Sequence, residues 1–196
     1  MHSYTTIQRL DPSIHPSYLI NSILTEHRTE IAMVQGDEHT PSKVGAGLFI
    51  VTDVGKDAPK VLLLKRSMTS GNPGSWGLPG GNQDLEDEGD LYVTALRESR
   101  EEMGNVLPAL RQIGAVLTKR GKHSQKHYTV FLVEAEDERV RETWSPALNE
   151  EHSEYRWFDV ATLHEMVDSL HPVVAQMVEE GPFRDIVHTS VGLTSS

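Results

Sequence analysis

Three glutamates and two arginines crowd into residues 97–102, where the chain reads RESREE. In a helix each residue turns by about 100°. If this stretch is helical, Glu98, Glu101 and Glu102 lie outside the stripe of apolar residues on the same helix, either beside it or opposite it. Carboxylates grouped on one helix face repel one another by roughly 0.2–0.5 kcal/mol per pair. A divalent cation such as Mg²⁺ or Mn²⁺ offsets such repulsion, because it takes oxygen ligands and keeps positions open for water and phosphate oxygens. The stretch is therefore a candidate metal site, and an ordinary solvated helix face is the alternative.

Two adjacent glycines precede this acidic stretch. The chain reads WGLPGG at residues 76–81, and Gly81 lies sixteen positions before Arg97. Glycine permits positive φ and close approach to the main chain, so a carbonyl or a ligand can sit against the backbone in the loop that leads into the helix. The glycine pair favours the metal site over the solvated helix face.

The elements that must position these residues follow from hydrophobic periodicity. A helix is expected over residues 90–103, because apolar positions recur there at helical spacing and Gly104 is a natural stop. Strands are expected as an adjacent pair over residues 44–51 and 60–66, a second pair over 114–118 and 127–133, and a short strand over 154–158. Further helices are expected over 16–32 and over 160–187, the latter broken near Pro172 or at Gly181-Pro182.

This order of elements predicts an α/β (α+β) sandwich with a mixed β-sheet. The expected organisation is an N-terminal extension with a helix over residues 1–43, a central domain over 44–163, and a C-terminal helical extension over 164–196 that packs on the same domain.

The acidic stretch and its surroundings resemble the Nudix box of the Nudix (MutT-like) hydrolase superfamily. The box reads Gly, five residues, Glu, seven residues, then Arg-Glu-hydrophobic-x-Glu-Glu-x-Gly-hydrophobic. Its second half matches at Arg97, Glu98, Glu101, Glu102 and Gly104, and the WGLPGG string is also typical of the family. The resemblance covers residues 44–163 and implies a Nudix-type α/β/α sandwich.

The first half of the box departs from the family pattern. Fifteen residues separate Gly81 from Arg97, two more than in the pattern, so the loop carries an insertion. The glutamate that pairs with the box arginine in the family must then be supplied by Glu88, Glu86 or Asp90. We favour Glu88.

The resemblance also implies a ligand set. The Gly81 carbonyl, Glu98 and Glu102 would bind Mg²⁺ or Mn²⁺, Glu101 would be a further ligand or the base, and Arg97 would support the site.

Two charged groups outside the box complete the implied site. Family members often carry a carboxylate in a loop before a tryptophan-containing strand, and the spacing to Trp157 favours Glu151 over Glu150 and Glu154. A polar loop that caps a strand is the alternative. Arg66 ends an apolar strand, where MutT-like members carry an arginine that faces substrate phosphate, and its bidentate geometry suits that role. A solvated arginine that ends a strand is the alternative.

One concentrated basic segment is present, at residues 119–126. As a hairpin tip, Lys119, Arg120 and Lys122 could reach over a polyphosphate, and a simple solvated turn is the alternative.

Composition excludes several classes of protein. The chain has 196 residues, a formal charge of −11 and no cysteine, so it has no disulfide, thiolate metal site or cysteine nucleophile. The negative balance argues against binding duplex nucleic acid. The N-terminus lacks the features of a secretory signal, and no apolar run approaches the roughly 20 residues that span a bilayer. A cytoplasmic protein with no membrane contact is expected.

The acidic stretch, the glycine pair and the resemblance to the Nudix box together predict a Mg²⁺-dependent hydrolase. Such an enzyme would cleave the diphosphate linkage of a nucleoside diphosphate linked to another group, X. The small-molecule substrate would be a nucleotide sugar, a nucleoside triphosphate or a dinucleoside polyphosphate. A catalytically silent Nudix-fold nucleotide sensor or partner-binding domain is the alternative, motivated by the displaced first glutamate. An isoprenyl diphosphate isomerase is disfavoured because such enzymes use a cysteine. The terminal extensions are candidates for homodimer contacts.

Overall fold

The computed structural model describes residues 41–180 apart from residues 55, 57, 106 and 108. The helix expected over residues 16–32 and the end of the C-terminal extension lie outside the described residues.

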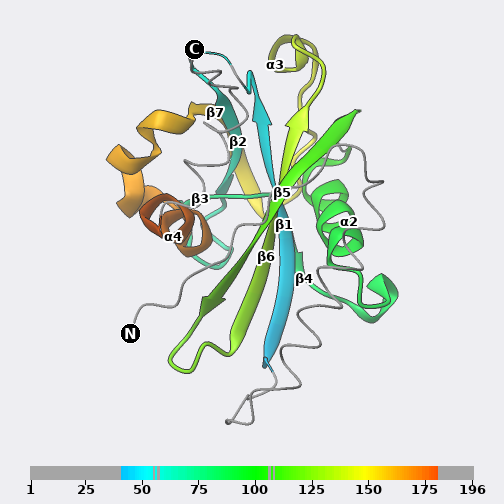
Figure 1. Ribbon diagram of the computed structural model, residues 1–196, viewed down its shortest axis with the longest axis vertical. Coiled ribbons are helices and arrows are strands. Elements are labelled where there is room, and N and C mark those ends of the chain that lie inside the picture. The colour runs from blue at the N-terminus through cyan, green and yellow to red at the C-terminus, as the bar shows by residue number, and fades with distance from the viewer. Residues whose placement is uncertain (1–40, 55, 57, 106, 108, 181–196) are drawn as a thin grey trace, which may run out of the picture.

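A mixed β-sheet of seven strands forms the centre of the described part of the chain (Figure 1). The strand order is β3-β2-β1-β6-β5, with β4 paired to β1 and β7 paired to β2. The strands are β1 (Lys43–Thr52), β2 (Lys60–Arg66), β3 (Trp76–Gly77), β4 (Gly80–Asn82), β5 (Leu110–Arg120), β6 (Lys126–Ala135) and β7 (His152–Asp159). Both expected strand pairs are confirmed, since β2 lies antiparallel to β1 and β6 antiparallel to β5. The parallel pairing of β1 with β6 makes the sheet mixed.

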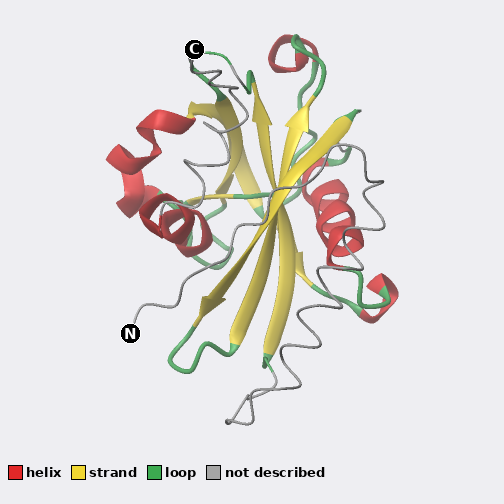
Figure 2. Ribbon diagram, viewed as in Figure 1, coloured by secondary structure: helices red, strands yellow, loops and turns green. Residues whose placement is uncertain are grey.

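Helices cover both faces of the sheet (Figure 2). Helix α2 (Leu91–Met103) lies on one face, and the 3-10 helix η2 (Val160–Ser169) and helix α4 (Pro172–Glu180) lie on the other. Strand β1 is buried on both sides, because Leu48 and Ile50 pack toward α2 while Phe49 and Val51 pack toward α4. The predicted α/β/α sandwich is therefore confirmed.

Local sequence explains where α2 begins and ends. The Asp90 carboxylate accepts hydrogen bonds from the backbone N–H groups of Tyr92 and Val93, which satisfies donors that have no partner within the helix. Gly104 ends the helix with φ at 71°, a conformation that glycine adopts readily. The buried Ser99 hydroxyl donates to the Ala95 carbonyl at 2.6 Å, so this polar residue in the apolar stripe is satisfied internally.

The C-terminal part differs from the expected regular helices. Residues Val160–Ser169 form a 3-10 helix with a kink at Met166, and α4 starts only at Pro172. The break thus falls at the first of the two expected places, where a proline suits the first position of a helix. Val173, Val174 and Met177 of α4 join the same apolar cluster as Phe49 and Val51.

A short helix, α3 (Val140–Thr143), lies at the end of the sheet opposite the β5–β6 hairpin (Figure 1). No helix in the described part of the chain combines the length and apolar character that crossing a membrane requires.

Candidate active site

The glycine pair occupies the short strand β4, which lies against β1. Gly80 pairs with Gly47 and Gly81 pairs with Ala46, and the Leu48 N–H donates to the Pro79 carbonyl at 2.9 Å. Gly80 has φ at +146°, and a Cβ there would overlap the backbone of β1. Only glycine fits this position without strain.

Glu102 reaches back from α2 to this strand. Its side chain is buried, and the Gly80 N–H donates to its Oε2 atom at 2.8 Å. Burial raises the pKa of Glu102 to about 8, against the lowering effect of the Gly80 hydrogen bond, and the nearby Glu98 adds to the rise. A carboxylate that is costly to ionise in isolation is one that a cation would stabilise.

Glu98 lies one helical turn earlier and fills the space that Gly81 leaves. A Cβ at Gly81 would overlap the Glu98 carboxylate. Burial raises the pKa of Glu98, while the Arg97 guanidinium lowers it. Two carboxylates of α2 therefore flank two consecutive glycines of β4.

Arg97 pairs with Asp87, which corrects the expected pairing with Glu88. The Nε and Nη2 atoms of Arg97 donate to the two carboxylate oxygens of Asp87, each at 2.9 Å. The Asp84 N–H and the Thr94 hydroxyl also donate to Asp87, at 2.8 Å and 2.9 Å. The Arg97 hydrogen bonds are the main cause that lowers the pKa of Asp87. Glu88 is exposed and ends a 3-10 turn with φ at 50°.

The conformation of the inserted loop explains why Asp87, and not Glu88, pairs with Arg97. Residues Leu85–Asp87 form a 3-10 helix, η1, whose capping residue is Asp84. The turn carries Asp87 inward and leaves Glu86 exposed, while Asp90 is used to cap α2. None of the three expected candidates therefore reaches Arg97.

Arg97 also connects the helix to the glycine strand. Its Nη1 atom donates to Glu98 at 3.0 Å and to Glu101 at 3.2 Å, and its Nη2 atom donates to the Asn82 carbonyl at 3.1 Å. The Glu101 side chain is 58% exposed, so this carboxylate lies at the solvent side of the cluster. Arg97 fixes the carboxylates without neutralising all of them.

Arg66 and Glu151, two candidates from distant parts of the sequence, meet beside this cluster. The Arg66 Nη2 atom lies 3.1 Å from Glu151 Oε2, and the Ser67 N–H donates to the Glu151 carbonyl at 2.8 Å. The charge of Arg66 lowers the pKa of Glu102, and that of Glu151 raises it. A cation and a further carboxylate are thus close enough to Glu102 to act at the same site.

The three basic residues predicted at the hairpin tip do not lie together in the structure. Lys119 and Lys122 are exposed, whereas Arg120 lies over the ring of Tyr128, with its Cζ atom 5.9 Å from the ring centroid. Strand alternation separates Lys119 from Arg120, so the three residues do not form one basic surface.

Two residues near the carboxylates did not emerge from the sequence. The His152 ring is buried with its Nε2 atom 3.9 Å from Glu102 Oε1, and burial lowers its pKa to about 4. The Tyr128 hydroxyl lies 2.6 Å from the position that a Cβ would take at Gly80. Each reaches the site through strand pairing between segments that are far apart in the chain. The spacing of neighbouring residues therefore does not predict their place at the site.

The donor chemistry of this site fits a hard divalent cation. No three acidic or histidine side chains in the described part of the chain are already arranged around a single metal position. The carboxylates of Glu98 and Glu102 nevertheless adjoin the Gly80–Gly81 backbone, and Glu101 and Glu151 lie at the edge. Oxygen donors of this kind suit Mg²⁺ and Mn²⁺.

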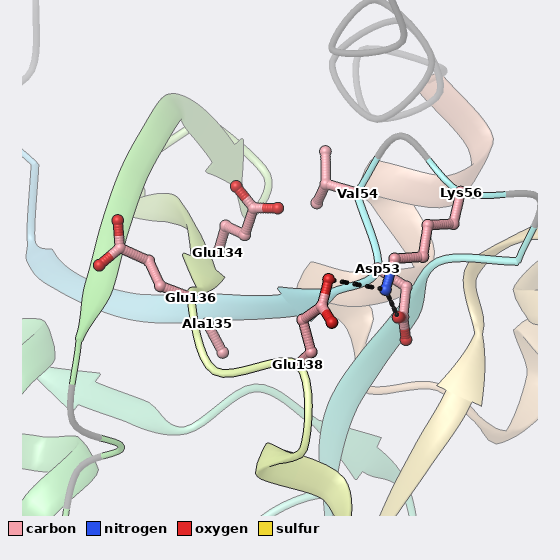
Figure 3. Close-up of a pocket in the computed structure, with 7 residues that line it drawn as sticks. All are labelled: Asp53, Val54, Lys56, Glu134, Ala135, Glu136 and Glu138. Atoms are coloured by element: carbon pink, nitrogen blue, oxygen red, sulfur yellow. Dashed lines mark hydrogen bonds and ion pairs between the residues drawn. The ribbon is translucent and has the colours of Figure 1, made fainter.

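A pocket of about 250 Å³ lies beyond the other end of β1 (Figure 3). Its lining residues are Asp53, Val54, Lys56, Glu134, Ala135, Glu136 and Glu138. Lys56 Nζ lies 3.0 Å from Asp53 and 3.4 Å from Glu138. At about 3.3 Å per strand residue, this pocket is some 20 Å from the glycine strand and is separate from the carboxylate cluster.

Comparison with known proteins agrees with this arrangement. A Mycobacterium tuberculosis protein named "Putative 8-oxo-dGTP diphosphatase 3" is 33% identical over 129 residues, which are 65% of this chain and 56% of that relative. The chain therefore matches little more than half of the relative's length.

Two solved structures share the fold. The Nudix hydrolase RenU of M. smegmatis is 23% identical with a TM-score of 0.61, covering 82% of this chain and 100% of that one. The NUDIX domain of Shewanella oneidensis NrtR, complexed with ADP ribose, is 21% identical with a TM-score of 0.52. The match covers 80% of this chain and 97% of that one. The family model described as NUDIX domain matches residues 41–180. The chain therefore belongs to the Nudix family.

Proposed function

We propose that this protein is a Mg²⁺- or Mn²⁺-dependent hydrolase that cleaves the diphosphate linkage of a nucleoside diphosphate linked to X. The products would be a nucleoside monophosphate and a phosphorylated X. The observation that carries this proposal is the placement of two α2 carboxylates, those of Glu98 and Glu102, against the Gly80–Gly81 backbone.

The cation would be held by Glu98, Glu102 and the Gly81 carbonyl, and when bound it would supply charge neutralisation and a more acidic water. Arg97 orients this ligand set, since it donates to Glu98 and to the Asn82 carbonyl next to Gly81. The Asp87 carboxylate in turn holds Arg97 in place through two hydrogen bonds.

Glu101 is assigned as the acceptor of the proton from the attacking water. It projects from the same helix as the metal ligands, and its side chain is 58% exposed, so it can contact both solvent and substrate. Glu151, 53% exposed and paired with Arg66, is the second carboxylate within this region. Arg66 would bind a phosphate oxygen, because its guanidinium offers a planar pair of donors.

The substrate is proposed to be a small nucleotide with two or more linked phosphates. The mycobacterial relative is named for 8-oxo-dGTP and the NrtR domain is complexed with ADP ribose. These names place a nucleoside triphosphate and a nucleotide sugar among the first compounds to test, with a dinucleoside polyphosphate as the third.

The Asp87–Arg97 pair weakens the argument for a catalytically silent domain. That alternative depends on a missing partner for the box arginine, and Asp87 supplies two hydrogen bonds to Arg97. The structure offers no separate observation that favours a silent sensor.

A panel assay tests the proposal. The full chain is incubated with Mg²⁺ and the three nucleotide classes, and products are resolved by anion-exchange chromatography. Glu101→Gln and Glu102→Gln are each compared with Glu142→Gln, a matched substitution on the remote helix α3. We expect turnover of one class, a loss of at least about a hundredfold in the first two variants, and no change in the third.

The absence of turnover of all three classes, with nucleotide binding independent of metal, would contradict the proposal and restore the silent sensor. Equal turnover in the three variants would show that the acidic stretch of α2 has no catalytic part.

A further inference from the structure

Arg120 and Tyr128 lie together on the sheet face that carries α4, across Gly80 from the carboxylates of α2. Arg120 ends β5 and Tyr128 lies in β6, opposite Thr118 in the strand register. The Arg120 Cζ atom is 5.9 Å from the centroid of the Tyr128 ring. The two side chains form a single patch, which we call the Arg120–Tyr128 patch.

Among the described residues, Arg120 is a half-buried cation without a counterion. Its Nε atom is inaccessible to solvent and has no hydrogen-bond partner among the described residues, and no ion pair of Arg120 occurs among them. Burial is the main cause that lowers the pKa of Arg120, yet an arginine remains protonated in a protein. Buried polar groups are normally satisfied, so an unpaired guanidinium N–H at this place indicates a missing acceptor.

The Tyr128 hydroxyl is a second hydrogen-bond donor of the patch. It makes no hydrogen bond within the described part of the chain, and it lies 2.5 Å and 2.6 Å from where a Cβ would stand at Gly47 and Gly80. Burial raises the pKa of Tyr128, and the charges of Glu102 and Glu98 raise it further. The phenol therefore stays protonated and can donate at neutral pH.

A further cation, Arg66, and a buried histidine, His171, lie in the same region. Arg66, at the end of β2, acts on Tyr128 in the same sense as Arg120. His171 precedes α4, and after burial the charges of Arg120 and Arg66 are the causes that lower its pKa. Helix α4 contacts both β3 and β5, so it holds His171 near the patch. The acidic groups Glu98 and Glu102 lie beyond Gly80.

We propose that Arg120 and Tyr128 form an anion-binding subsite that takes a phosphate group of the substrate, next to the carboxylate cluster of α2. Both groups are hydrogen-bond donors and Arg120 carries a positive charge, which together favour an anionic ligand. Gly80 lies between the two halves of the site, which allows one polyphosphate to contact the patch at one end and a cation held by α2 at the other.

The identity of the anion as part of a nucleotide rests on the proposed function. The subsite extends that function by a substrate requirement: the substrate carries a phosphate beyond those contacted by the cation, as in a nucleoside triphosphate or a dinucleoside polyphosphate. The alternative is purely structural, with Arg120 covering the Tyr128 ring through a cation–π contact.

Binding of inorganic pyrophosphate to the full chain, measured by isothermal titration calorimetry in EDTA, tests the subsite without turnover. Arg120→Gln removes the charge and the fork, and we expect its affinity to fall by about tenfold to a hundredfold. Tyr128→Phe removes only the hydroxyl, and we expect a loss of about three- to tenfold. Arg139→Gln, an exposed arginine that precedes α3, is the matched control and should bind as the natural protein does.

Arg120→Lys separates the contribution of the positive charge to pyrophosphate affinity from that of the planar guanidinium group. It keeps the cation and loses the planar fork, so its affinity should lie between those of the natural protein and Arg120→Gln. Thermal unfolding of each variant is recorded in parallel, because a structural cation–π role would lower the melting temperature and leave pyrophosphate affinity unchanged.

The outcomes separate the two proposals. Unchanged pyrophosphate affinity in both Arg120→Gln and Tyr128→Phe, or no binding by the natural protein, overturns the subsite. Loss of affinity in these variants, together with no nucleotide turnover by the natural protein in Mg²⁺, supports the subsite and overturns the proposed hydrolase.

Discussion

Alanine substitution should mainly lower stability at Gly80 and mainly lower activity at Gly81. At Gly81 an added methyl group meets the Glu98 carboxylate, the far end of a flexible side chain. At Gly80 it meets the Ala46 carbonyl and the Gly47 backbone, and φ there is +146°. Gly81→Ala should therefore displace the Glu98 carboxylate, the proposed metal ligand, and Gly80→Ala should distort the sheet.

The magnitudes follow from these contacts. A non-glycine residue at such a φ costs about 1–3 kcal/mol, and forcing a methyl group against fixed backbone costs about 1–3 kcal/mol more. Gly80→Ala should therefore lose about 2–6 kcal/mol of unfolding free energy. Gly81→Ala should lose no more than about 1 kcal/mol, because Glu98 can rotate away.

The assay is urea unfolding followed by tryptophan fluorescence, together with Mg²⁺-dependent turnover of the nucleotide identified by the panel. Gly89→Ala is the control: its Cβ meets open space but its φ is +86°, so it should lose about 1–2 kcal/mol and keep its activity. Gly81→Ala should remain folded and lose at least tenfold in turnover.

The reasoning is refuted if Gly81→Ala turns over substrate as the natural protein does. It is also refuted if Gly80→Ala and Gly81→Ala are equally stable, because the structure makes only the first a clash with backbone.

Three further predictions concern residues around the cluster. Asp87→Asn should lower both the melting temperature and turnover, since it removes the charge that holds Arg97, whereas Glu88→Gln should change neither. Arg66→Gln should raise KM for the nucleotide more than Lys122→Gln does, because Arg66 adjoins the carboxylates and Lys122 is exposed. Burial lowers the pKa of His171 to about 4 from 6.5, so below pH 6.5 the unfolded chain binds a proton that the folded chain excludes. Unfolding free energy should then fall by up to about 3 kcal/mol between pH 6.5 and pH 4, and His171→Gln should reduce this dependence.

A specific outcome would contradict each of these three predictions. Equal melting temperatures for Asp87→Asn and Glu88→Gln would mean that Asp87 does not hold Arg97. A larger KM effect from Lys122→Gln would return the phosphate contact to the hairpin tip. Identical pH profiles of urea unfolding with and without His171 would remove the buried histidine as a cause of acid sensitivity.

The main elements were predictable from sequence because their periodicity is local. The helix expected over residues 90–103 is observed as Leu91–Met103, and its capping by Asp90 and Gly104 depends on neighbouring residues alone. The two strand pairs likewise follow from short apolar runs. The acidic cluster of α2 and its proximity to the glycine pair follow from the same spacing.

Which acidic residue is expected to pair with Arg97 depends on the end of the box from which the residues are counted. The inserted loop folds into a 3-10 turn capped by Asp84, and the turn decides which acidic side chain points inward. Counting back from Arg97 by the family spacing reaches Gly89, next to Glu88, whereas counting forward six positions from Gly81 reaches Asp87. The turn buries Asp87 and exposes Glu88.

Tyr128 was missed for a different reason. Its place beside Gly47 and Gly80 depends on the parallel register of β1 with β6 and on the pairing of β4 with β1. Register between distant strands is set by the whole sheet and leaves no signal in a single short segment. Arg120 was a candidate from the sequence, but its separation from the lysines of its hairpin follows from strand alternation.

The most direct test of the central claim is divalent cation binding at the α2 cluster. Mn²⁺ is titrated into the natural protein, Glu98→Gln, Glu102→Gln and the matched control Glu142→Gln, and free Mn²⁺ is measured by electron paramagnetic resonance. We expect one or more Mn²⁺ sites whose affinity falls at least tenfold in the first two variants and is unchanged in the control. Equal Mn²⁺ affinity in all four proteins would contradict this expectation.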